Sequence, residues 1–262
     1  MNGGKAAALV AVMLLLQVAS VAALTAGEAK QAWLDAKSQT MQATATHQDA
    51  KLQRAANNTP ENRQAVVDTG KALQNAALDE AEAWLNWKKL EAQEDPLVPE
   101  ELKQRIYADV DANLNKVTEL RAEVAAVTNE IELGVVSLKM IGKYFELLAD
   151  VARNVGLMWA HVGDVHADRA AEFEAKLRST AESVNASPAV FSKLDSAVTE
   201  LETARRNIAS AQAAYELVRI PGTPFLKFAE GNGYLRAAQA NLLGAVAQLN
   251  QAYAMVTLRA GA

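Results

Sequence analysis

Apolar residues recur with helical spacing through most of the chain, and four short runs rich in proline, glycine and asparagine interrupt them. These runs lie at 57–62, 94–101, 183–190 and 219–234. In the first, Thr59 precedes Pro60, which is the order of a helix N-cap and its first residue. The pattern predicts helices over about 26–56, 60–93, 99–184, 188–219 and 233–259. No alternating run of β-branched and aromatic residues predicts a strand.

The range 99–184 carries the most regular pattern, in which apolar residues repeat every seven positions. One column runs from Val117 to Phe173 and keeps the seven-residue step without slippage. A strict heptad favours a left-handed supercoil with a partner helix. A continuous helix over this range would be about 130 Å long, at about 1.5 Å per residue. Three glycines are the places where it could bend or break: Gly134, Gly156 and Gly163.

Between Ile131 and Val165 a third apolar column appears beside the first two. Two columns need one partner helix, whereas a wider stripe needs several. Short connections favour antiparallel neighbours. The sequence therefore predicts an all-α fold, an elongated antiparallel helical bundle or coiled coil with one very long central helix, spanning 24–262 as a single domain. The partner face could belong to this chain or to another.

The N-terminus has the pattern of a secretory signal peptide. Lys5 is followed by an apolar stretch from Ala6 to Leu24, and cleavage is expected after Ala23, which removes residues 1–23. The alternative is an uncleaved signal anchor, because the stretch is nearly long enough to span a bilayer. Both alternatives place the rest of the chain outside the cytoplasm: secreted, in a periplasm-like space or at the cell surface.

The composition excludes several kinds of chemical site. The chain has no cysteine, which excludes disulfides, thiolate metal sites and cysteine nucleophiles. Its net charge is −5, with no basic patch among aromatic residues, so we expect no nucleic-acid partner. The sequence contains no Gly-x-Ser-x-Gly and no Gly-rich phosphate loop. It therefore predicts no catalytic residues, no cofactor and no enzymatic activity.

Three residues suggest a metal site. His161, Asp164 and Asp168 are spaced three and seven positions apart, so they share one face of a helix. Histidine and carboxylates can bind zinc. The sequence favours the alternative, a solvated polar face near the end of a long helix, and so predicts no metal site. His166 falls in a heptad column, where a lone polar residue more often sets register than binds a ligand.

The four tryptophans allow two interpretations. Trp33, Trp84, Trp87 and Trp159 could form an aromatic ligand site, or they could pack in the core. Trp84 and Trp87 share one helix face and could instead contact a partner or a membrane.

Two sequons lie at predicted helix connections. Asn57 begins Asn-Asn-Thr, and Asn185 begins Asn-Ala-Ser. Outside the cytoplasm, both are candidates for glycosylation.

These observations predict an extracytoplasmic scaffold, spacer or protein-interaction module that pairs with a protein partner, or with itself, through its heptad faces. One alternative is a membrane-active bundle of the lipid-binding or pore-forming kind, suggested by the apolar range 131–165. Against it, the longest uncharged run there, Asn154 to Gly163, is too short to span a bilayer. Membrane contact would otherwise come only through an uncleaved N-terminal segment. A further alternative is a helical bundle that binds a metal or a small ligand.

Overall fold

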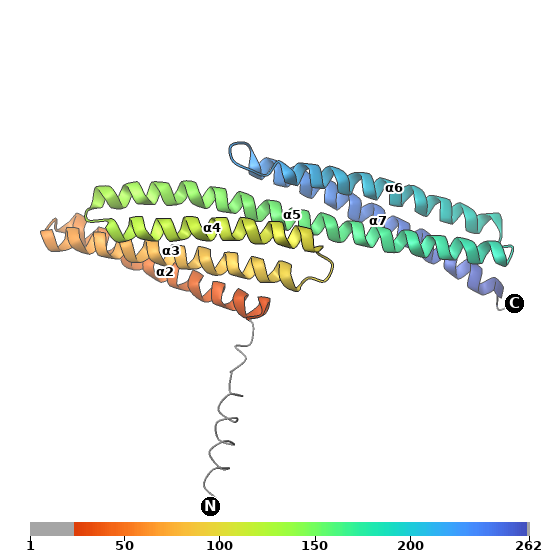
Figure 1. Ribbon diagram of the computed structural model, residues 1–262, viewed down its shortest axis with the longest axis horizontal. Helices are drawn as coiled ribbons and strands as arrows, with labels where there is room; N and C mark the ends of the chain where they lie inside the picture. Colours follow the sequence, from red (N-terminus) through yellow and green to blue (C-terminus); the bar gives the residue numbers. More distant parts are fainter. Residues whose placement is uncertain (1–23, 261–262) are drawn as a thin grey trace, which may run out of the picture.

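The computed structural model describes residues 24–260, and every regular element within that range is an α-helix (Figure 1). The expected signal segment, 1–23, lies outside the described residues. The all-α fold class is confirmed. The helices are α2 (Ala26–Ala56), α3 (Pro60–Glu94), α4 (Glu100–Ala126), α5 (Glu130–Ser183), α6 (Pro188–Glu216) and α7 (Pro224–Ala260).

The predicted continuous helix over 99–184 is wrong, because the chain turns back at 127–129 and forms two antiparallel helices, α4 and α5. Asn129 is the N-cap of α5. Its side-chain oxygen accepts hydrogen bonds from the backbone N–H groups of Ile131 and Glu132, each at 3.0 Å. An asparagine before acidic first-turn residues is a recognised signal for a helix start. The seven-residue spacing of apolar residues happens to continue across this turn, so the spacing alone does not reveal it.

The glycines expected to break the long helix do not do so. Gly134, Gly156 and Gly163 all lie inside α5, which continues through them. Likewise, α7 begins at Pro224 and continues through Gly231 and Gly233. The irregular stretch predicted over 219–234 is therefore shorter than expected. At both Gly156 and Gly231 an added Cβ atom would overlap the ring of Tyr215. These two glycines therefore allow close helix packing rather than a bend.

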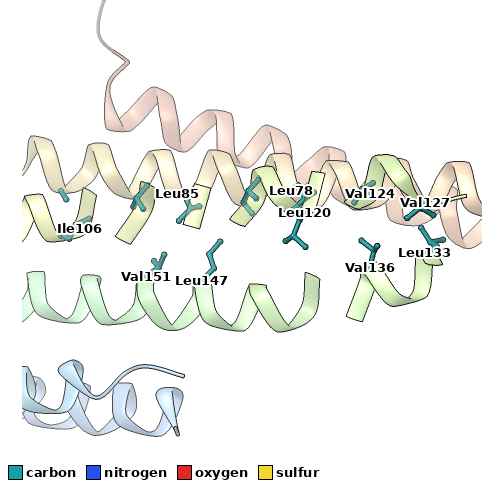
Figure 2. Packing of buried hydrophobic residues seen from close by; sticks show 14 of the residues in the cluster. Leu78, Leu85, Ile106, Leu120, Val124, Val127, Leu133, Val136, Leu147 and Val151 are labelled. Carbon is teal, nitrogen blue, oxygen red and sulfur yellow. The ribbon is translucent and has the colours of Figure 1, made fainter. Parts of the chain in front are cut away.

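The core forms along α5, which packs against two sets of partners (Figure 1). Its first part packs on α3 and α4, and Figure 2 shows Leu147 and Val151 of α5 pointing toward those helices. Its later part packs on α6 and α7 through small residues, which let the helices approach closely. Fully buried alanines on these three helices include Ala160, Ala167, Ala181, Ala197, Ala204, Ala211, Ala245 and Ala252.

The heptad column of α5 has a partner along only part of its length. Three aromatic residues of the column contact aromatic residues of α7 with ring centroids 6.2–6.4 Å apart, in the pairs Phe145–Phe225, Trp159–Phe228 and Phe173–Tyr253. Because α7 begins only at Pro224, the earlier part of the column has no such neighbour. There Ile131 is 81% exposed and Leu138 is 72% exposed. Within this chain, these two residues therefore have no partner helix, and pairing with another chain stays a prediction.

An ion pair connects the two sets of helices. Arg105 of α4 donates from both terminal guanidinium nitrogens to the two carboxylate oxygens of Glu216 at the end of α6, each at 2.6 Å. Beside it, Arg153 of α5 donates to Asp109 of α4 at 2.8 Å. Of these two contacts, the Arg105–Glu216 pair links the end of α6 to α4, and the Arg153–Asp109 pair links α5 to α4.

Candidate functional site

An apolar cleft of about 900 Å³ lies among α2, α3, α4 and α5. It exists because α2 packs along α3 and not along α5. Among the described residues, Cα atoms of α2 and α5 nowhere come within 8 Å of each other. The floor of the cleft comes from α3 and α4, and its two walls come from α2 and α5. Its apolar lining includes Leu73, Ala77, Leu78, Ala81, Val117, Leu120, Met140, Ile141, Leu147 and Leu148.

The cleft closes where α2, α3 and α5 converge. Gly70 of α3 leaves room for the side chain of Leu133 from α5, and a Cβ atom there would overlap it. His47 of α2 reaches the same place and lies within hydrogen-bonding distance of Thr69, at 3.1 Å. Burial lowers the pKa of His47, and the nearby positive charge of Lys51 lowers it further. His47 therefore packs between helices and does not line the cleft.

Three of the four tryptophans line the opposite end of the cleft. The rings of Trp33 from α2 and Trp87 from α3 stack with their centroids 5.1 Å apart, and Trp84 lies one turn away. Trp159 lies apart from them, in contact with α7. Three of the four tryptophans therefore lie together at the cleft, and a role for them in ligand binding stays a prediction. The grouping could be suspected from the Trp84–Trp87 spacing, but Trp33 joins it only through the α2–α3 hairpin.

Gln74 is a buried polar residue at the end of the cleft nearer Gly70. It is only 5% exposed. Its amide nitrogen donates to the carbonyl oxygen of Leu133 at 3.0 Å and to the Ser137 hydroxyl oxygen at 2.8 Å. A carbonyl oxygen can only accept, so the amide nitrogen must face it and the orientation of the side chain is fixed. The Oε1 atom is then a buried acceptor without a hydrogen-bond partner among the described residues. Sequence reasoning missed Gln74, because its burial depends on the return of α5.

Lysines surround the cleft. Lys37, Lys88, Lys116 and Lys143 line it from four different helices, whereas Glu80 is the single acidic lining residue. The Lys88 ammonium lies 3.8 Å from the Trp87 ring centroid and pairs with Glu91 at 2.7 Å.

The remaining lysines leave a surplus of positive charge. Lys116 and Lys143 both pair with one carboxylate, that of Glu146, each at 3.0 Å. Hydrogen bonds from Lys143 and Lys116 lower the pKa of Glu146, and burial opposes them. Lys37 forms no ion pair within residues 24–260, and its ammonium lies 5.3 Å from the Trp33 ring centroid. The cleft is thus apolar along its walls and cationic at its margin.

The residues proposed for a metal site lie on α5, away from this cleft. His161 and Asp164 are half-buried, and Asp168 is exposed and pairs with Arg205 of α6 at 2.7 Å. Within the described residues, no group of three or more histidine, aspartate or glutamate side chains is arranged to hold a metal ion. His166 lines a smaller cleft of about 450 Å³ between α5 and α7, beside Trp159.

Both sequons lie at connections between helices, as the sequence predicts. Asn57 is the C-cap of α2, and Asn185 follows the end of α5 with a positive φ of 52°. Both side chains are exposed. Glycosylation of either residue stays a prediction.

Comparisons with protein-family models, with curated proteins and with solved structures each found no match to this chain. In the range 24–260, no helix combines the length and the apolar character needed to cross a membrane.

Proposed function

We propose that this chain is a non-enzymatic helical binding protein that works outside the cytoplasm and holds an apolar ligand in the cleft between α2 and α5. The observation that carries the proposal is the cleft itself. Its volume, about 900 Å³, falls within the range of small-molecule sites, and such sites are mainly apolar with a few placed polar groups. The signal-like pattern of residues 1–23 supports the extracytoplasmic location.

The chemistry of the lining supports binding rather than catalysis. No histidine is among the residues that line the cleft. The Ser137 hydroxyl donates to the backbone carbonyl oxygen of Leu133 at 2.9 Å, and a backbone carbonyl cannot act as the base that activates a nucleophile. The polar groups present are suited to orienting a bound molecule.

A neutral fluorescent probe tests the proposal directly. N-phenyl-1-naphthylamine should bind saturably, at one molecule per chain, with a rise in its emission. The variant Ala77→Trp fills the cleft from its floor and should abolish this binding. Ala72→Trp is the matched control, because Ala72 lies on the exposed face of the same helix. Absence of probe binding to the unmodified chain, or equal binding by both variants, would contradict the proposal.

A second candidate function is association with a protein partner or with a second copy of the chain. The supporting observation is the exposed apolar face of α5 formed by Ile131, Val135 and Leu138. Light scattering coupled to size exclusion should then report a dimer or larger species. Leu138→Glu should shift it to a monomer, whereas Leu243→Glu, at a comparably exposed position on α7, should not. A monomer for the unmodified chain would exclude self-association through this face.

An elongated antiparallel arrangement around α5 forms part of the same proposal. With its 54 residues, α5 has a length of about 80 Å at about 1.5 Å per residue. Small-angle X-ray scattering should give a maximum dimension of at least this length. A distinctly shorter value would exclude the role of spacer or scaffold.

A further inference from the structure

Building on the proposed function, we infer that the cleft takes a free long-chain carboxylate. The cleft offers two features to such a molecule: apolar walls along its length and surplus positive charge at its margin. Each feature matches a different part of the ligand.

The positive charge selects an acid. Lys37 of α2 and Lys143 of α5 line the cleft from its two walls, and Lys116 lies on its floor helix α4. Lys88 is left out of this count, because it is already paired with a glutamate outside the lining. The three remaining ammonium groups face two carboxylates, those of Glu80 and Glu146. One positive charge is left over. A carboxylate would neutralise it through charge-assisted hydrogen bonds, most directly to Lys37.

The aromatic and aliphatic walls select a long apolar chain. Trp87 and Gln74 are thirteen residues apart on α3, which is about 20 Å along the helix. Between them the lining is almost entirely apolar, including Leu78, Ala81 and Trp84. An extended hydrocarbon chain would cover this surface and remove it from water.

Calorimetric titration of the full chain with three probes tests the assignment. The probes are laurate and its two uncharged counterparts, methyl laurate and 1-dodecanol, each below its aggregation concentration. We expect laurate to bind about tenfold more tightly than either of the others, since each of them lacks the carboxylate that forms the charge-assisted hydrogen bond. Lys37→Gln should reduce the preference for the acid over the ester, and Lys176→Gln, at an exposed position on α5, should leave it unchanged.

The outcomes separate this ligand assignment from the proposed function. Equal binding of the three probes by the unmodified chain overturns the ligand class and leaves a cleft that binds apolar molecules. Binding of N-phenyl-1-naphthylamine without binding of any of the three has the same meaning. Failure of all four probes overturns both. Because the comparison among probes is made on the unmodified chain, it decides the matter even if a variant does not fold.

Discussion

The ring of Tyr215 on α6 lies directly against the backbone of Gly156 on α5, where any side chain would overlap it. The same ring also lies against Gly231 of α7, where an added Cβ atom would again overlap it. The tyrosine is fully buried, and its hydroxyl donates to the side-chain oxygen of Asn232 at 2.7 Å. Three helices therefore meet at one aromatic ring because two glycines leave room for it.

We expect Gly156→Ala to lower the free energy of unfolding by about 1–3 kcal/mol, because overpacking outweighs the gain of about 1 kcal/mol in helix propensity. Urea denaturation followed by circular dichroism measures this change. Gly134→Ala is the matched control, since it lies in the same helix with open space around it. It should raise the free energy of unfolding by about 0.5–1 kcal/mol. A stabilised Gly156→Ala variant would rule out the close contact.

Tyr215 should make stability depend on pH in the alkaline range. Burial raises the pKa of its hydroxyl to about 12, and Arg236 acts in the opposite direction. The unfolded chain ionises tyrosine near pH 10, so the contribution is complete below about pH 10 and is lost as the pH rises toward 12. We expect Tyr215→Phe to be less stable by about 1 kcal/mol at neutral pH, through the lost hydrogen bond, and to lose less stability in the alkaline range.

Unfolding free energies measured at neutral and alkaline pH check this expectation. Tyr253→Phe is the matched control, because Tyr253 is 52% exposed. It should keep the pH dependence of the unmodified chain. The same loss of stability in Tyr215→Phe and Tyr253→Phe would argue against a role for the buried hydroxyl.

The Arg105–Glu216 pair should stabilise the folded chain at neutral pH but not in acid. Hydrogen bonds from Arg105 hold the pKa of Glu216 below its usual range, while burial acts against them. The stabilisation is therefore present above the unfolded value of about 4.3 and is lost as the pH falls through the lower folded value. Both side chains are partly exposed, at 40% and 47%, so the effect is about 0.5 kcal/mol.

Glu216→Gln should accordingly be slightly less stable than the unmodified chain at neutral pH, and the two should converge in acid. Chemical denaturation at both pH values measures the difference. Glu172→Gln, at an exposed position of α5, serves as the control and should change nothing at either pH. A constant difference at both pH values would show that the carboxylate charge is not responsible.

The turn between α4 and α5 depends on Asn129. We expect Asn129→Ala to lower the free energy of unfolding by about 1 kcal/mol, because two backbone N–H groups of α5 lose their acceptor. Asn129→Asp keeps a side-chain oxygen and should be close to neutral. Thermal unfolding measures both variants. An unchanged melting temperature for Asn129→Ala would mean that water satisfies those groups equally well.

The helix ends marked by local chemistry could be predicted from the sequence. The ends of α2 agree with expectation, and Thr59 caps α3 through a hydrogen bond from Asn62, as the Thr-Pro order indicates. The prediction of one helix over 99–184 was wrong, because heptad spacing alone does not distinguish one continuous apolar stripe from two stripes joined by a short turn. The local signal, Asn129 before acidic residues, was present. Gly231 led to the opposite error: it suggested a loop where α7 is helical. The glycine is needed there to make room for the ring of Tyr215 from another helix.

The candidate site was only partly predictable. The aromatic character of Trp84 and Trp87 could be noted from their spacing, but the cleft arises from where α2 and α5 do not meet. That separation is a property of tertiary packing, and no local pattern encodes it. The unsatisfied oxygen of Gln74 is likewise defined by contacts with α5, more than fifty residues away in sequence.

The sharing of α5 between two sets of helices has a mechanical consequence. The wall of the cleft around Ile141 and the surface that carries α6 and α7 belong to one continuous rod. The two sets of helices are thus not independent of each other: a change in the tilt of α5 at the cleft would also move the surface on which α6 and α7 pack.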